Sequence, residues 1–145
     1  MYRERLWPSP GLLIALILII PATLLVFLPI NPEVGVAVAI VLYAGSVVAL
    51  VISSPTITVT DRELHAGYAH IPLDAIAHVE AYTGSDATQQ RGPLLDARAW
   101  LIVRGWVQPV LKVTLNDSDD PTPYWLLSTR RPAQLADAIT QHRSV

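Results

Sequence analysis

Two stretches decide the fold: residues 11–28 read GLLIALILIIPATLLVFL, and residues 33–53 read EVGVAVAIVLYAGSVVALVIS. Apart from Glu33, at the start of the second stretch, neither contains a charged residue. A helix over residues 11–28 is about 27 Å long, which is close to the roughly 30 Å of a bilayer's hydrocarbon layer. The sequence therefore predicts two membrane-spanning helices.

The residues around these stretches contain the signals that start and bend helices. Ser9 and Asn31 each precede a proline, as expected for an N-cap residue followed by proline in the first turn. The connection at residues 29–32 is so short that the two helices form an antiparallel hairpin. Pro21 lies inside the first span and predicts a kink, because proline lacks the N–H of a helical hydrogen bond.

The orientation of the hairpin is predicted from the arginines. Arg3 and Arg5 flank the first span, whereas the loop between the spans carries no basic residue. Basic residues stay on the cytoplasmic side, so we expect both termini in the cytoplasm of a multi-pass protein of the inner (plasma) membrane. We expect Tyr2 and Trp7 to anchor at the interface. A cleaved signal peptide is disfavoured, because no small-residue cleavage site follows the first span.

Small residues recur along one face of the second helix: Gly35, Ala39, Ser46 and Ala49. Such residues allow membrane helices to approach closely. The face packs either within the hairpin or against a partner.

The rest of the chain has the composition of a soluble domain. Overall, 52% of residues are hydrophobic and 15% are charged, and charges become frequent only from Asp61 onward. We therefore divide the chain into a hairpin domain, residues 1–54, and a cytoplasmic domain, residues 55–145.

Alternating and β-branched segments predict a small antiparallel β domain. A helix over residues 132–142 should cover the sheet, which makes the whole chain an α+β membrane protein. We expect Gly67 to form a bulge. Residues 83–98 are rich in turn formers and predict a loop, with a helical turn over residues 94–98 as an alternative for its last part. The expected strands are residues 56–60, 64–71, 76–82, 99–104, 110–115 and 124–129.

Aromatic and basic residues gather in the second half of this domain. Trp125 has the strand parity of Leu127 and is expected to be buried. The set has two interpretations: aromatic core residues with arginines paired to Asp117, Asp119 or Asp120, or an exposed recognition surface. The candidate interaction surface consists of Trp100, Arg104, Trp106, Tyr124, Arg130 and Arg131.

Several classes of function find no support in the sequence. The net charge of −2 does not favour nucleic acid, and the lack of cysteine excludes disulfides and thiolate chemistry. The four histidines lack the spacing of a zinc site, and the acidic run lacks that of a calcium loop. No phosphate-binding loop or nucleophile elbow is present. We predict no catalytic residue, metal or cofactor, and no enzymatic activity.

Two resemblances accompany this interpretation. The pattern of residues 57–79 resembles bacterial pleckstrin-homology-like (PH-like) domains, which implies a PH-like β domain ending in a helix. Three further blocks resemble a family of small two-span actinobacterial membrane proteins of unknown function. They are YRERL (residues 2–6), RAWLIVRGWV (residues 98–107) and DDPTPYWLLSTRRP (residues 119–132). The resemblance implies an actinobacterial inner-membrane location and no particular activity.

Three hypotheses for function remain. The first is a non-enzymatic, membrane-anchored interaction or assembly module that binds a protein partner or a second copy of itself. The second is a module for lipid headgroups or small ligands at the cytoplasmic leaflet. It requires a basic pocket formed by Arg62, Arg104, Arg130 or Arg131. The third, an enzyme, requires a cleft with converging titratable groups.

Overall fold

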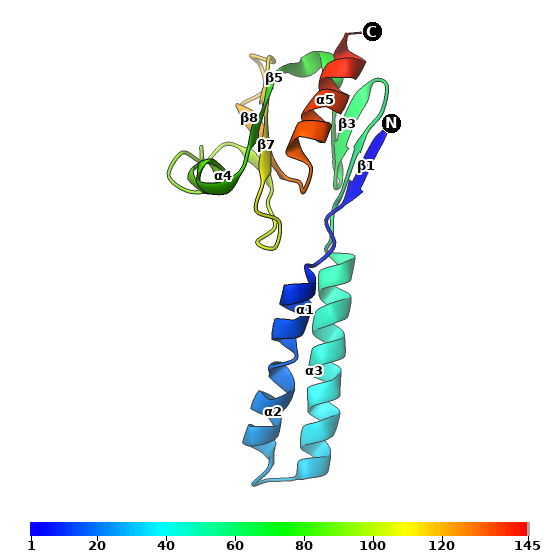
Figure 1. Ribbon diagram of the computed structural model, residues 1–145, viewed down its shortest axis with the longest axis vertical. Helices are drawn as coiled ribbons and strands as arrows, with labels where there is room; N and C mark the ends of the chain where they lie inside the picture. The colour runs from blue at the N-terminus through cyan, green and yellow to red at the C-terminus, as the bar shows by residue number, and fades with distance from the viewer. Residues whose placement is uncertain (145) are drawn as a thin grey trace. The chain divides into compact units, whose positions relative to one another are not determined.

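The computed structural model describes residues 1–144, and it divides into two compact units. The helical unit is Trp7–Ser54, and the β unit combines Met1–Leu6 with the chain from Pro55 onward. Residues 1–6 therefore leave the hairpin domain to which the sequence assigned them. They contain strand β1 (Tyr2–Arg5), which pairs with β2 (Thr56–Val59), the first strand after the helices (Figure 1).

The helical unit contains α1 (Pro10–Leu16), α2 (Ile19–Phe27) and α3 (Pro32–Ile52). Figure 1 shows α1 and α2 running beside α3. Two helical segments, Pro10–Phe27 and Pro32–Ile52, are long and apolar enough to cross a membrane, each with a mean hydropathy of 2.6.

The helix signals in the sequence act as expected. The Ser9 hydroxyl accepts a hydrogen bond from the Leu12 N–H, and the Asn31 side chain accepts one from the Glu33 N–H at 3.0 Å. The first span is interrupted between α1 and α2, four residues before Pro21. Because Pro21 has no N–H to offer, the Ile17 carbonyl accepts from the Ile20 N–H at 3.0 Å in a tighter turn.

The first sheet of the β unit is an antiparallel meander in the order β1-β2-β3-β4. Its last two strands are β3 (Glu63–Ala66) and β4 (Ala69–Pro72). The predicted strand over residues 64–71 is therefore two strands. Gly67 forms a turn between them, not a bulge, because its φ of +62° suits the first position of a two-residue hairpin loop.

The second sheet has the order β5-β7-β8-β6. The 3-10 helix η1 (Leu73–Ala75) leads into it. All pairings are antiparallel except that β6 runs parallel to β8, which departs from the antiparallel sheet expected from the sequence. The four strands are β5 (Ile76–Tyr82), β6 (Trp100–Ile102), β7 (Val110–Leu115) and β8 (Tyr124–Ser128).

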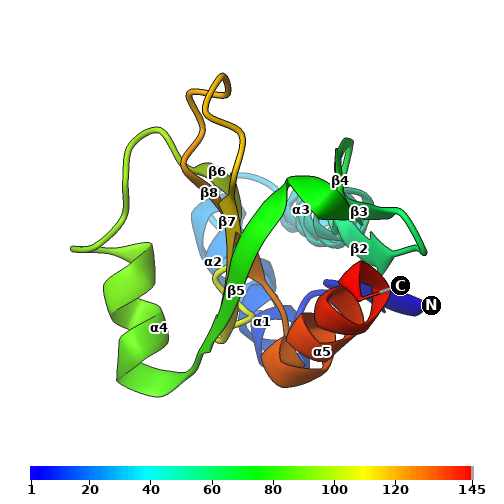
Figure 2. The same cartoon turned by 90° about the horizontal axis from the view of Figure 1, so that it is seen from above.

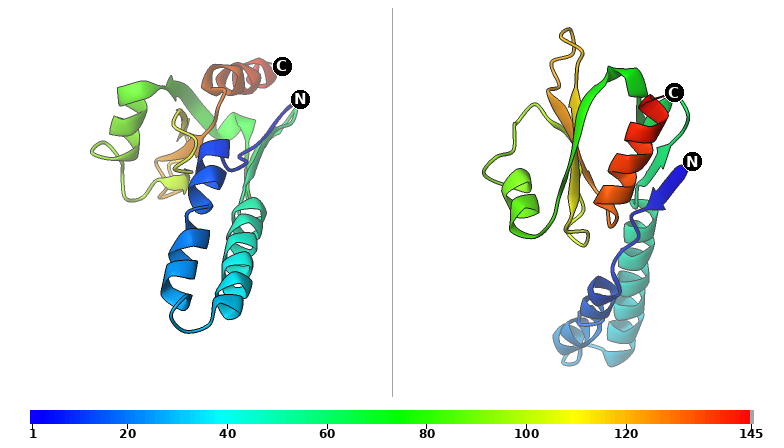
Figure 3. Two further views of the ribbon diagram at one scale, coloured as in Figure 1. Left: turned by 60° about the horizontal axis from the view of Figure 1, so that its bottom comes forward. Right: turned by 45° about the horizontal axis from the view of Figure 1, so that its top comes forward.

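Two helices cover opposite faces of the second sheet (Figure 3). Helix α5 (Pro132–Arg143) contacts β5 and β7 and also reaches β2 of the first sheet (Figure 2). Its buried residues Leu135 and Ile139 join the main core. Helix α4 (Gly84–Arg91) covers the other face, so β8 is buried throughout. The sequence predicted a loop there, because the polar segment GSDATQQR has no apolar period.

Candidate functional site

The aromatic members of the predicted surface mostly build the interior. Trp125 is 6% exposed, as the sequence predicted, and it contacts Trp100 with ring centroids 4.4 Å apart. Tyr124 is buried on the other face of β8, where its hydroxyl accepts a hydrogen bond from the Asp96 N–H at 2.8 Å. Arg98 binds the Asp96 carboxylate at 3.0 Å, and these hydrogen bonds hold the pKa of Asp96 below its usual range.

Two other members of the set lie where the β unit connects to the helices. We define the junction end as the end of the β unit around Leu6 and Pro55, whose backbones share a 2.9 Å hydrogen bond. The Trp106 indole N–H donates to the Leu6 carbonyl at 3.2 Å. The Arg104 N–H donates to the Ser128 hydroxyl at 3.0 Å. The loop between β6 and β7 therefore belongs to the junction end.

A carboxylate on β1 holds the N-terminal strand to the end of β8. Glu4 accepts a hydrogen bond from the Tyr2 hydroxyl at 2.8 Å and another from the Thr129 hydroxyl. The backbone N–H of Arg130 donates to its second oxygen at 2.8 Å. Charge-assisted hydrogen bonds of this kind are stronger than neutral ones. Tyr2 is thus part of the β unit, which corrects its expected place as an interfacial anchor.

The environment of Tyr2 keeps its hydroxyl in the donor form. Burial raises the pKa of Tyr2 to about 12, and the Glu4 carboxylate acts in the same direction, whereas Thr129 and the positive charge of Arg131 lower the pKa. The phenol therefore remains a hydrogen-bond donor to Glu4 well above physiological pH. Arg131 itself is exposed and lies at the start of α5.

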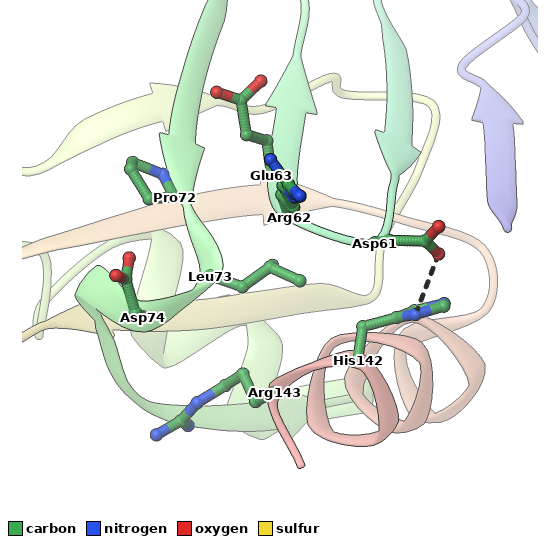
Figure 4. A pocket seen from close by; sticks show the side chains of 8 residues that line it. All are labelled: Asp61, Arg62, Glu63, Pro72, Leu73, Asp74, His142 and Arg143. Atoms are coloured by element: carbon green, nitrogen blue, oxygen red, sulfur yellow. Dashed lines mark ion pairs between the residues drawn. The ribbon is translucent and has the colours of Figure 1, made fainter. Parts of the chain in front are cut away.

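The opposite end of the β unit contains an open hollow (Figure 4). We define the distal end as the turn between β2 and β3, η1 and the loop over residues 116–123. The hollow has a volume of about 410 Å³, and His142 on α5 lies 3.4 Å from the Asp61 carboxylate at its rim. Its lining is Asp61, Arg62, Glu63, Pro72, Leu73, Asp74, His142 and Arg143.

Hydrogen bonds to backbone carbonyls connect the elements of the distal end. The Leu73 N–H donates to the Arg62 carbonyl at 2.9 Å, and the Asn116 N–H donates to the Ala75 carbonyl at 2.9 Å. The guanidinium of Arg143 donates to the Ala77 carbonyl at 3.2 Å. These bonds connect the β2–β3 turn, the segment that joins the sheets and the end of α5. The hollow is thus a recess with charges of both signs, and hydrogen bonds join the elements around it.

The four arginines from which a basic pocket was expected divide between the two ends of the β unit. Arg62 lines the distal hollow, whereas Arg104 and the adjacent Arg130 and Arg131 lie at the junction end. The two ends are separated by the length of β2, which is roughly 13 Å at 3.3 Å per residue. The acidic loop has a local role: Asp117 and Asp120 accept hydrogen bonds from backbone N–H groups of that loop at 2.9 and 2.8 Å.

Two histidines that the sequence left apart become neighbours. His65 on β3 is paired with His70 on β4, and their rings stack with centroids 5.5 Å apart. Glu63 lies 3.0 Å from the His65 ring nitrogen. Over residues 1–144, no group of three or more His, Cys, Asp or Glu side chains is placed to hold a metal ion. The pair lies on a partly exposed sheet face.

The small-residue face of α3 divides into two parts. Gly35 and Ala39 are buried, and Gly35 lies against Phe27 and Leu24 of α2. Ser46 is half-buried and donates its hydroxyl hydrogen to the Leu42 carbonyl at 2.7 Å. Ala49 is exposed within the described chain. The first part of the face thus packs inside the hairpin.

This division leads to a test in the helical unit. Gly35→Leu should loosen the hairpin, because a Cβ at this position would lie 2.8 Å from the Phe27 Cβ. Ala49→Leu adds a similar bulk at an exposed position and serves as the matched control. Disulfide trapping between cysteines introduced on α2 and α3 of the cysteine-free chain measures the packing. Equal trapping in both variants would contradict this assignment of the face.

Sequence reasoning missed the parts of the site that come from the N-terminus. Glu4 and Tyr2 were assigned to the flank of a membrane span, and the alternating burial of the segment YRER becomes visible only in the structure. Thr129 was expected only as the end of a strand. The hollow was missed because Asp61 and His142 meet only when α5 packs across the β unit.

The chain matches the profile of a protein family. The profile of a family described as protein of unknown function, DUF3093, covers residues 1–139. The chain belongs to this family. The match includes β1, both helical segments and most of α5. Neither a curated protein nor a solved structure matches the chain.

Proposed function

We propose that this DUF3093 protein is a non-enzymatic, membrane-anchored interaction module. Its helical unit spans the membrane as a hairpin, and its β unit holds a protein partner on the cytoplasmic side. The observation that carries the proposal is the pairing of β1 with β2 across the helical insertion. Two covalent connections, one on either side of the hairpin, tether the β unit to the helical unit at Leu6 and at Pro55.

This pairing also supports the proposed topology. Tyr2 is opposite Val59, and Arg5 is opposite Thr56, so the chain enters and leaves the helical unit from adjacent strands. Hydrogen-bonded neighbours in one sheet cannot lie on opposite sides of a bilayer. Arg3 and Arg5 then favour the cytoplasmic side. We place the protein in the inner (plasma) membrane of an actinobacterium, as its resemblance implies.

The strand order supports a PH-like interpretation of the β unit. A four-stranded meander, β1 to β4, is followed by the antiparallel strands β5, β7 and β8 and then by the C-terminal helix α5. In this interpretation the hairpin is inserted after the first strand, and α4 and β6 are inserted into the second sheet. The distal hollow, a preformed recess with charges of both signs, is the surface we assign to the partner.

The topology has a direct test. Reporters that are active only in the cytoplasm should work when fused to either end of the chain, because β1 holds the N-terminus beside the β unit. A reporter inserted in the loop over residues 29–31 should give the opposite result. Opposite results at the two ends would contradict the hairpin, and periplasmic activity at both would contradict the orientation.

The partner surface is tested by site-specific photo-crosslinking in native membranes. A photoreactive residue in place of Arg62, in the distal hollow, should give a discrete crosslinked species. Arg98 is the matched control position, since it is an exposed arginine outside the hollow and paired with Asp96. A crosslink to a second copy would identify self-assembly. Equal crosslinking at both positions would contradict the assignment of the hollow.

A further inference from the structure

We propose that the junction end of the β unit rests on anionic phospholipid headgroups, with Tyr68 in the interfacial layer. This proposal rests on the membrane anchoring proposed above and goes beyond it, since it assigns a lipid-binding surface to the folded domain. The occupant is the headgroup layer of the membrane that the hairpin crosses.

The first argument is covalent reach. Leu6 lies four residues before Pro10, where α1 begins, and Pro55 lies three residues after Ile52, where α3 ends. At no more than about 3.6 Å per residue, these connections span at most roughly 14 Å. The polar layer of each leaflet is roughly 5–8 Å thick. The junction end therefore stays within roughly 14 Å of the helix ends and can reach the headgroup layer.

The second argument is the side chains that this end exposes. Gly67 and Tyr68 form the tip of the β3–β4 turn, and the Gly67 N–H donates to the Thr56 carbonyl at 2.9 Å, one residue from Pro55. Tyr68 is 107% exposed, so the fold of the β unit gives it no packing role. Trp106 is half-buried beside Leu6. Tyrosine and tryptophan are the residues enriched at membrane interfaces.

The third argument is the distribution of charge along the β unit. Arg5, Arg104, Arg130 and Arg131 lie at the junction end, and Arg91 reaches it by donating to the Gln108 amide oxygen at 2.6 Å. Acidic groups on this side include Glu4, which accepts the hydrogen bonds described above, Asp86 on α4, and Glu80 on β5, which accepts a hydrogen bond from the Tyr82 hydroxyl at 2.9 Å.

The distal end carries the opposite charge. Its acidic residues outnumber its arginines, which include Arg62 and Arg143. An anionic leaflet attracts basic residues that lie next to the membrane. We therefore expect a domain beside such a leaflet to have its basic end near the membrane and its acidic end away from it. The distal acidic residues are Asp61, Glu63, Asp74, Asp117, Asp119 and Asp120.

The test uses the full chain in nanodiscs and single cysteines in a chain that has none. Tyr68→Cys and Ser118→Cys, the latter on the distal loop, each receive the same fluorophore. Lipids with a spin label in the headgroup should quench the label at residue 68 and leave the label at residue 118 bright. Added phosphatidylglycerol should strengthen the quenching relative to phosphatidylcholine alone, and high salt should weaken it.

The arginines are tested in the same system. The label at residue 68 reports the ratio of molecules whose β unit contacts the headgroups to molecules whose β unit does not. Arg104→Gln and Arg130→Gln should each lower this ratio roughly fivefold in anionic discs. Arg62→Gln, at the distal end, should leave it unchanged. Resistance to a protease pulse confirms that each variant is folded.

The outcomes separate the two proposals. If the labels at residues 68 and 118 are quenched equally, and the chain still resists extraction from the membrane, the proposed lipid contact is wrong. The proposed membrane anchoring then still holds. A label at residue 68 that is shielded by a second copy would overturn the lipid contact in the same way. A chain that alkaline washing removes from membranes would overturn both the anchor and the contact.

Discussion

Trp125→Ala is expected to lower the free energy of unfolding of the β unit by about 3–5 kcal/mol. The side chain is 6% exposed, belongs to the main core and lies opposite Val113 on β7. Its removal leaves a cavity and also removes the ring that contacts Trp100. Because a small domain has only about 5–15 kcal/mol of stability, a large share of the protein would unfold.

Pulse proteolysis across a urea series measures this loss on the full chain in detergent. Tyr68→Ala is the control, because this aromatic side chain is fully exposed and should change the stability by no more than about 0.5 kcal/mol in detergent. Equal midpoints for the two variants would show that Trp125 does not support the core.

Leu6→Ala should destabilise the same β unit by about 2–5 kcal/mol, although Leu6 precedes both helices in the chain. Leu6 is fully buried in the main core together with Ile57, and its N–H donates to the Pro55 carbonyl at 2.9 Å. Truncation leaves a cavity between the N-terminal segment and the first sheet.

Leu94→Ala makes the same chemical change at a side chain that is 60% exposed, and it should leave the unfolding midpoint within about 0.5 kcal/mol of the parent protein. The same protease assay compares the two. If Leu6→Ala lowered the free energy of unfolding no more than Leu94→Ala, the first residues would not fold with the β unit. The topology argument from β1 would then lose its basis.

The sequence by itself determined the features that depend on local chemistry. The apolar runs, the caps at Ser9 and Asn31 and the break before Pro21 all follow from side chains and backbone groups within a few residues of each other. The burial of Trp125 follows from strand parity, which is equally local. These are the features that the structure confirms.

Tertiary structure alone decided where distant segments meet. Strand β1 could not be assigned from four polar and aromatic residues, because its stability comes from β2 and from the Glu4 hydrogen bonds to Thr129 and Arg130. Helix α4 has almost no apolar face, and it forms because Ala87 packs on the second sheet. The distal hollow and the basic junction end likewise depend on pairings between residues far apart in the chain, which local propensity and periodicity do not encode.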